Sequence, residues 1–153
     1  MVTNLQAPEE DVDTVHEIAR LLFQVTEQTR HHFESAARRL DLTASQARTL
    51  LELESPSSMR LLADRLHCDA SNITGLADRL EARGLVVRQP DRADRRIKTL
   101  VLTADGRRAR AELEDAVRNS PVMAGLTAAE RTTLHGLLVK AAEAGGAGCC
   151  PSR

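Results

Sequence analysis

The stretch of sequence that decides the fold is residues 69–103, DASNITGLADRLEARGLVVRQPDRADRRIKTLVLT. Its first half predicts a short helix, because Asp69 is a favourable N-cap, apolar residues recur at helical spacing and Gly84 is a favourable terminator. Its second half predicts a β-hairpin, since aliphatic runs at 85–88 and 97–102 enclose a polar, turn-rich loop at 90–96. The predicted fold is therefore mainly α-helical with a small β-hairpin wing, a winged helix-turn-helix.

The face of this helix opposite the apolar stripe carries small and polar residues, namely Ser71, Asn72, Thr74, Gly75 and Arg79. Short side chains let a helix approach base edges, and Asn, Ser and Thr hydrogen-bond with the donors and acceptors of the major groove. The pattern therefore indicates contact with double-stranded DNA. An ordinary amphipathic surface helix would look the same, so the helix alone leaves both interpretations open.

The predicted hairpin tip carries Arg92, Arg95 and Arg96, with Asp91 and Asp94 among them. Arginines at the tip of a hairpin can reach phosphates or a narrow minor groove. Aspartates would be repelled by phosphate, so we expect them to pair with neighbouring arginines and to fix the shape of the loop. An ion pair from Asp94 to Arg95 or Arg96 would be a structural role that competes with DNA contact.

Charge is distributed unevenly along the chain. The 153 residues carry a net charge of −1, which by itself argues against non-specific binding to nucleic acid. Residues 79–110, however, hold ten Lys/Arg and four Asp/Glu, whereas residues 1–58 hold five and ten. This asymmetry is expected when one face of a protein meets phosphate and another does not. A solvated basic surface is the alternative.

A longer run, residues 61–106, carries four motifs in order: L-A-x-x-L in one helix, L-x-x-x-G-L at the end of the next, D-R-R in the wing and L-T-x-x-G before the following helix. In these motifs the run resembles the DNA-binding lobe of the multiple-antibiotic-resistance regulator (MarR) family. Two positions depart from the family pattern. Gly75 stands where relatives often carry a larger polar or basic residue, and Arg60 stands where a small capping residue is common, which leaves Ser57 or Ser58 as the cap.

The resemblance implies a homodimer that pairs through its N- and C-terminal helices and carries two DNA-reading lobes. It also implies a transcriptional repressor, or less often an activator, that is released by a small anionic or aromatic compound. Two-fold symmetry predicts an inverted-repeat operator with half-sites about 10 base pairs apart. Ser71, Asn72 and Thr74 would contact bases or nearby phosphates, Arg79 the DNA backbone, and the arginines of the wing the adjacent groove.

The rest of the chain reads as helices, and its length favours a single domain over residues 1–153. Helices are predicted at 11–40, 43–54, 61–68, 103–119 and 127–141, with capping boxes at Thr43/Gln46 and Thr127/Glu130. We assign 42–102 to the winged helix-turn-helix lobe, 11–40 and 103–144 to dimerisation helices, and the glycine-rich 145–153 to a flexible tail. Apolar stripes on the terminal helices favour a homodimer, and an intramolecular hairpin that leaves a monomer is the alternative.

Residues that could sense a signal are few. Arg20, His31 and Phe33 lie on the long first helix and are candidates for an effector pocket, although surface or packing roles explain them more simply. Cys149 and Cys150 are adjacent in the tail and would make the chain a redox-responsive regulator, an alternative to a small-molecule effector. Cys68 falls at the turn of the motif and is interpreted as a buried filler.

Other function classes lack their signatures. The chain has two Phe and no Trp or Tyr, which argues against the aromatic platforms of single-stranded nucleic-acid readers. No glycine-rich phosphate loop or other catalytic motif is present, so no enzyme is expected. A winged-helix protein-interaction module is a third class, and its binding would lack the steep salt dependence of DNA contact.

Metal and membrane binding are not expected either. His31 and His32 are adjacent on a helix and point in different directions, and no cluster has metal-ligand spacing, so we predict no metal and no cofactor. No apolar run approaches the roughly 20 residues of a membrane span, and the acidic N-terminus has no signal-peptide pattern. The three cysteines form no disulfide framework, which fits a cytoplasmic protein.

Overall fold

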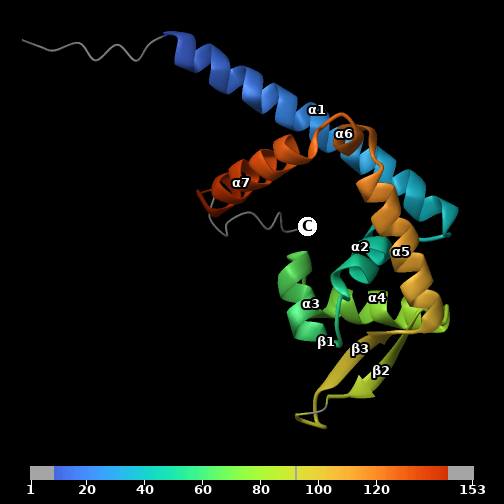
Figure 1. The fold of residues 1–153 in the computed structure, drawn as a ribbon. Coiled ribbons are helices and arrows are strands. Elements are labelled where there is room, and N and C mark those ends of the chain that lie inside the picture. The colour runs from blue at the N-terminus through green and yellow to red at the C-terminus, as the bar shows by residue number, and fades with distance from the viewer. Residues whose placement is uncertain (1–8, 92, 145–153) are drawn as a thin grey trace, which may run out of the picture.

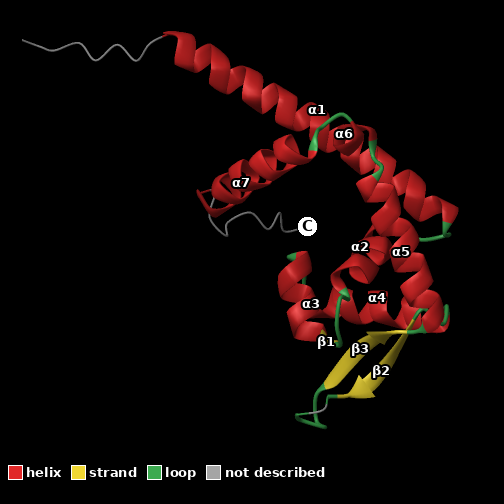
Figure 2. Ribbon diagram, viewed as in Figure 1, coloured by secondary structure: helices red, strands yellow, loops and turns green. Residues whose placement is uncertain are grey.

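The structure, a computed structural model, describes residues 9–91 and 93–144 and is mostly helical (Figures 1 and 2). The helices are α1 (Glu9–Arg39), α2 (Ala44–Glu52), α3 (Met59–Leu66), α4 (Ala70–Ala82), α5 (Ala104–Arg118), α6 (Pro121–Ala124) and α7 (Ala128–Ala144). The strands are β1 (Ser57–Ser58), β2 (Val86–Pro90) and β3 (Lys98–Leu102). The predicted fold class, mainly α with a small β wing on a helix-turn-helix, is confirmed.

The sheet has one strand more than the sequence predicts. Its order is β1-β3-β2, and all pairings are antiparallel. β2 and β3 form the expected hairpin with Val87 opposite Val101, while Ser57 and Ser58 pair with Leu100 and Thr99 on the other side of β3. A two-residue strand of serines has no alternating pattern to reveal it, so only the hairpin could be predicted.

The core lies where α2, α3 and α4 pack against the sheet and α5 (Figure 2). Its fully buried large side chains are mostly aliphatic and come from every layer: Leu50, Leu53, Leu62, Ile73, Leu80, Val86, Leu100 and Leu113. On α4 the buried residues recur at helical spacing, which leaves the opposite face free. The packing therefore fixes which side of α4 faces solvent.

Two glycines bring α4, the wing and α5 together. Gly84 ends α4 in the left-handed region with φ +69°, as its predicted role of terminator requires. Thr103 caps α5: its hydroxyl accepts a hydrogen bond from the Gly106 amide at 3.0 Å and donates one to the Gly84 carbonyl at 2.6 Å. A Cβ on Gly106 would lie 1.9 Å from the Leu85 carbonyl oxygen, so only glycine allows this approach. The L-x-x-x-G-L and L-T-x-x-G motifs thus form one contact.

Several predicted helix ends are confirmed and others shift. The Thr43/Gln46 capping box starts α2, and the Thr127 and Glu130 side chains form the reciprocal bonds of a capping box at the start of α7. Ser58 caps α3, so this helix begins at Met59 rather than at residue 61. Asp69 holds the N-cap position of α4, but its side chain makes no capping hydrogen bond.

The segment after α5 was predicted as a break and contains a further helix. Pro121 follows the end of α5 and occupies the first turn of the short helix α6, which Ser120 caps. Proline lacks the N–H that a first-turn position leaves unbonded in any case, so it both ends one helix and starts the next.

The two long terminal helices leave much apolar surface uncovered. α1 crosses the top of Figure 1 and α7 lies below it. On α1 the exposed large apolar side chains are Val12, Val15, Ile18, Leu21, Leu22, Phe23 and Val25, and on α7 they are Leu137, Leu138 and Val139. α7 has no buried residue. These helices therefore present apolar faces that one copy of the described chain does not cover.

Candidate nucleic-acid interface

The α4 face predicted to meet DNA is open to solvent. Ser71, Asn72, Thr74 and Arg79 are exposed and Gly75 is half-buried, while the intervening apolar residues lie in the core. Nothing lies within 4 Å of the position that a Cβ on Gly75 would occupy, so packing does not require glycine there. Short polar side chains on an exposed face are what a helix needs to enter a groove.

The two aspartates of the wing tip bind main-chain amides of the loop. The Asp91 carboxylate accepts hydrogen bonds from the amides of Ala93 at 2.8 Å and Asp94 at 3.2 Å. The Asp94 carboxylate accepts one from the Arg96 amide at 2.9 Å. Among the described residues no ion pair joins either aspartate to Arg95 or Arg96, so the predicted pairing stays a prediction. The carboxylates bind main-chain amides of the loop. The side chains of Arg95 and Arg96 form no ion pair with another described residue.

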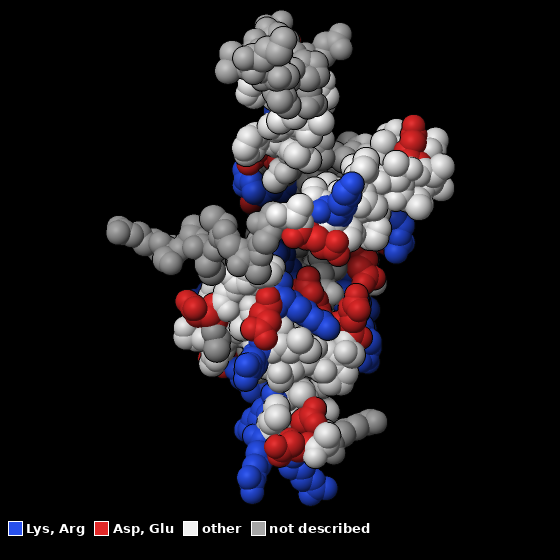
Figure 3. Space-filling view, turned by 90° about the vertical axis from the view of Figure 1, so that its left-hand side faces the viewer, with Lys and Arg blue, Asp and Glu red and all other residues white. Residues whose placement is uncertain are grey.

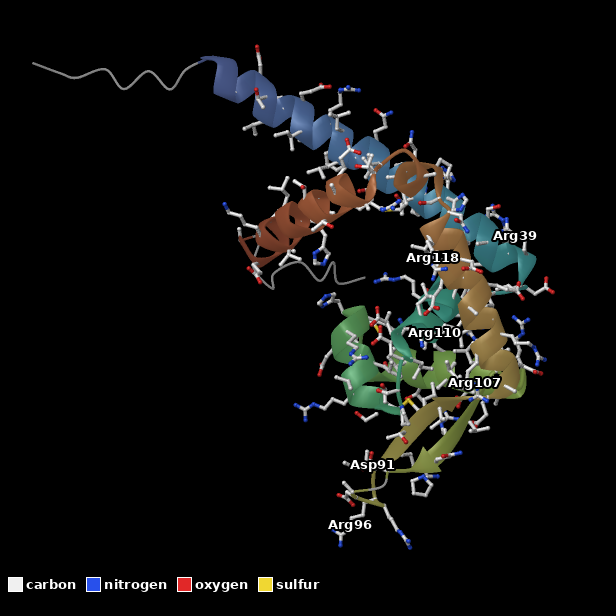
Figure 4. All side chains as sticks on the ribbon, viewed as in Figure 1. Arg39, Asp91, Arg96, Arg107, Arg110 and Arg118 are labelled. Carbon is white, nitrogen blue, oxygen red and sulfur yellow. The ribbon has the colours of Figure 1, made fainter. Side chains whose placement is uncertain are left out.

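Basic side chains gather at the far end of the hairpin. Figure 3 shows Lys and Arg at the lower end of the molecule, and Figure 4 places Asp91 and Arg96 at the tip. Arg95, Arg96 and Lys98 are all exposed, and Arg92 lies outside the described residues. The described tip therefore presents long cationic side chains on a loop whose backbone is fixed by hydrogen bonds.

Much of the basic excess in residues 79–110 serves internal contacts, a role that the charge count could not reveal. Five of its ten cations bind acceptors within the chain: Arg83, Arg88, Arg107, Arg108 and Arg110. Arg83, for example, donates to the Leu40 carbonyl at 2.9 Å, and Arg107 on α5 donates to the Leu102 carbonyl at 3.0 Å (Figure 4). The surface left for an anionic partner is therefore smaller than the sequence suggests and lies on α4 and the wing tip.

Arg88 has the densest of these internal contacts, and the sequence analysis gave it no role. Its guanidinium binds the Asp78 carboxylate at 2.6 Å and also pairs with Glu81, and its amide donates to Glu81 Oε1 at 3.1 Å. These bonds, the one to Asp78 foremost, raise the pKa of Arg88 further. The sequence does contain a pattern for this ion pairing, because two carboxylates three residues apart on one helix precede an arginine in the next strand. Only the fold shows that these side chains meet.

The predicted effector residues do not gather around a common cavity. An open cavity of about 370 Å³ lies between α1 and α5 and is lined by His32, Arg39, Glu112, Asp115, Ala116 and Asn119. Of the predicted residues, Arg20 binds Glu17 at 2.6 Å on the surface of α1, His31 is exposed, and Phe33 packs against the core. None of these three lines the cavity, whereas the neighbouring His32 does, with its Nε2 2.9 Å from the Ala116 carbonyl.

Cys149 and Cys150 lie outside the described residues. Cys68 was interpreted as a buried filler and is half-buried, packed against the edge of the core. Within residues 9–91 and 93–144 there is no group of three His, Cys, Asp or Glu side chains that could hold a metal ion. None of the helices described is both long enough and apolar enough to cross a membrane.

An exposed polar helix beside an arginine-tipped hairpin, flanked by long helices, defines the chain as a winged helix-turn-helix protein. Comparison with known proteins shows which family of winged helix-turn-helix proteins the chain resembles. The MarR family pattern matches residues 40–97. CouR from Rhodococcus jostii RHA1, solved with p-coumaroyl-CoA bound, has a TM-score of 0.68 at 30% identity, covering 79% of this chain and 88% of that one. The reduced form of MarR from E. coli has a TM-score of 0.66 at 26% identity, covering 90% and 98%.

A curated relative agrees with these structures. The transcriptional regulator TtmR of Methylorubrum extorquens strain PA1 is 36% identical over 110 residues, which are 68% of this chain and 56% of that protein. The chain spans about half the length of the curated relatives that it matches. The chain belongs to the MarR family of transcriptional regulators, as the four motifs in residues 61–106 predicted.

Proposed function

We propose that this chain is a sequence-specific regulator of transcription that binds double-stranded DNA, acts in the cytoplasm as a homodimeric repressor, and is released by a small-molecule effector. The observation that carries the proposal is an exposed polar face on α4 together with a wing tip where Arg95 and Arg96 are exposed and form no ion pair with another described residue. A helix in the major groove with a basic hairpin beside it would contact both bases and backbone.

The roles of individual residues follow from where they lie. Ser71, Asn72 and Thr74, on the first turns of α4, would read base edges or hold nearby phosphates. Arg79, one turn or more further along, would bind the DNA backbone, and Gly75 would contribute only main-chain atoms. Arg92, Arg95 and Arg96 would hold the neighbouring groove, with the loop shaped by Asp91 and Asp94.

A homodimer is supported by the uncovered apolar faces of α1 and α7. Phe23 is 75% exposed and Leu137 60% exposed in the single chain, and apolar faces of this extent on two helices are typical of surfaces that a second copy covers. We assign α1 and the helices after the wing to dimerisation and the intervening lobe, residues 42–102, to DNA. An inverted-repeat operator with half-sites about 10 base pairs apart would match this symmetry.

A small-molecule effector is supported by the similar fold of CouR, which was solved with p-coumaroyl-CoA bound. The open cavity of about 370 Å³ between α1 and α5 is the site that we propose for the effector. It lies between two proposed dimerisation helices, α1 and α5, and α5 also packs on α2 of the DNA lobe, so a ligand there would bias how the dimer helices and the lobe are arranged. A coupling of about 1–3 kcal/mol between effector and DNA would suffice for release.

The proposal is tested by selecting duplexes from a random library with the purified chain at two salt concentrations. We expect one inverted repeat to be enriched, with an affinity that falls steeply as salt rises because counterions are released from the phosphates. Enrichment of no sequence at either salt concentration would contradict the proposal and favour a protein-interaction module. The selected duplex then serves as the probe in a screen for effectors.

A further inference from the structure

Arg88 connects the two parts of the proposed DNA interface. It lies in β2, the first strand of the wing, while its partners Asp78 and Glu81 lie on α4, the helix proposed to enter the groove. Both its guanidinium and its main-chain amide donate to these carboxylates, so the side chain of Arg88 and the backbone of β2 are both bonded to α4. Within the described residues no other ion pair joins a side chain of the wing to one of α4.

Arg88 is poorly placed to bind DNA itself. Only 22% of its side chain is exposed, and its guanidinium already donates to Asp78, Glu81 and, at 3.5 Å, the Thr74 carbonyl. A phosphate could bind only by displacing a carboxylate. Arg95 differs in both respects, since it is exposed and has no ion-pair partner among the described residues.

The contact also matters because of where the carboxylates lie. The Asp78 side chain is 63% exposed and sits beside Arg79 on the helix proposed to face phosphates. A carboxylate near DNA is repelled unless a cation accompanies it. Asp78 and Glu81 together with Arg88 carry a combined charge of −1, so the trio as a whole does not attract DNA. Its contribution to binding must therefore come from geometry.

We propose that Arg88 is a positioning residue of the DNA interface: by binding Asp78 and Glu81 it fixes the wing relative to α4, so that the helix and the wing-tip arginines reach the same duplex. The inference rests on the proposed function. A bidentate guanidinium that bridges two carboxylates gives directional bonds which a flexible loop alone cannot provide. Without these bonds, DNA binding by the wing would have to offset the entropy lost when the hairpin is held in one orientation.

The test removes the charges of Asp78, Glu81 and Arg88 together, so that a loss of DNA affinity cannot be explained by a loss of positive charge. The variant Asp78→Asn/Glu81→Gln/Arg88→Gln replaces a trio of charge −1 by a neutral one, which electrostatics alone would make a better DNA binder. We expect instead that its affinity for the duplex selected by the wild-type chain falls about tenfold, equivalent to about 1.4 kcal/mol. Unchanged or tighter binding would overturn the inference. The matched control Asp105→Asn/Arg108→Gln neutralises an exposed ion pair on α5 and should leave affinity unchanged.

A double-mutant cycle supplies a readout that a loss of stability alone would not move. Arg95→Gln should weaken binding in the wild-type chain but have less than a twofold effect in the triple variant, because a wing that is no longer positioned has lost the contact already. Additive effects would overturn the inference. If the triple variant does not fold, as judged by its thermal melt, the cycle is run with Arg88→Lys, which keeps the charge but not the bidentate geometry. A wild-type chain that binds no duplex would contradict the proposed function, which is a separate outcome.

Discussion

At the scale of single residues, Gly106 and Gly75 are both helical glycines in different surroundings. Gly106 meets the Leu85 carbonyl where a Cβ would lie 1.9 Å away, whereas nothing lies within 4 Å of a Cβ on Gly75. We expect Gly106→Ala to destabilise the fold by about 1–3 kcal/mol or more, because the wing and α5 must move apart. Gly75→Ala should stabilise it by about 0.5–1 kcal/mol, since alanine favours the helix. Urea denaturation of both variants measures the difference, and equal effects would contradict it.

Asn72 and Arg95 should affect DNA binding in different ways. Asn72→Ala is expected to weaken binding to the selected operator by about 1–3 kcal/mol and to change binding to mixed-sequence duplex little, because a base contact is lost. Arg95→Ala should weaken binding to both duplexes and lower the slope of log affinity against log salt by about 1, because a phosphate contact is lost. Titrations of both duplexes at several salt concentrations separate the two. An equal loss on every duplex for Asn72→Ala would exclude it from base reading.

Residue partners were harder to predict than residue exposure. The exposed face of α4 follows from the periodicity of its buried residues, so the sequence was sufficient for it. The partners of Asp91 and Asp94 were not predictable from charge, because backbone amides two or three residues away are already held close, while an arginine side chain must lose rotamer freedom to pair. Arg88 required the fold itself, since its partners lie seven and ten residues earlier.

At the scale of elements, the capping box of α7 has a testable charge state. Glu130 Oε2 accepts hydrogen bonds from the Thr127 amide at 2.7 Å and from its hydroxyl at 2.8 Å, and these bonds lower the pKa of Glu130 below 4.5. Because the folded pKa is the lower one, the stabilisation is present above pH 4.5 and is lost as the pH falls through the folded pKa. We expect the start of α7 to fray in that acidic range.

NMR titration of the Glu130 carboxyl carbon measures this pKa directly. Thr127→Val removes the hydroxyl donor but keeps the main-chain amide, which has the larger effect, so the pKa should rise only part of the way toward 4.5. Thr127→Ser is the matched control and should leave the pKa where it is. A midpoint at or above 4.5 in the unaltered chain would show that the capping box does not form.

Elements with strong local patterns were predictable, and elements defined by contacts were not. The capping residues of α2, α5 and α7 mark their starts in the sequence, and the aliphatic runs of β2 and β3 mark the hairpin to within two residues. β1 exists because Ser57 and Ser58 lie alongside β3, and α6 because Ser120 and Pro121 begin a turn after α5. The pairing of β1 with β3 and the turn of the chain into α6 depend on tertiary contacts rather than on composition.

At the scale of the whole molecule, the proposed homodimer depends on the apolar face of α1. Val15 is 58% exposed in the single chain, and Val15→Glu would place a carboxylate in the dimer contact without a partner. We expect the dimer dissociation constant to rise by more than about tenfold, because an unpaired buried charge costs several kcal/mol. Operator affinity should fall with it. Analytical ultracentrifugation measures the change.

The control for this variant introduces the same charge elsewhere on α1. Gln24 is exposed and lies away from the apolar stripe, so Gln24→Glu should leave the dimer intact. Equal dissociation of both variants would point to net charge rather than to the apolar face. A wild-type chain that sediments as a monomer would favour the intramolecular arrangement of the terminal helices instead.

The Arg88 amide has a consequence for how copies of this chain meet one another. Because it donates to Glu81 rather than across the ladder, Val86, Arg88 and Pro90 turn their main-chain nitrogens to the open edge of β2. Proline has no N–H to offer, Val86 is buried, and the Arg88 amide is occupied, so this edge has no accessible donor for an incoming strand. The opposite side of the sheet is closed by a strand of only two residues. An incoming strand would therefore find carbonyl acceptors but no accessible N–H donor on this edge, which disfavours strand-by-strand aggregation here.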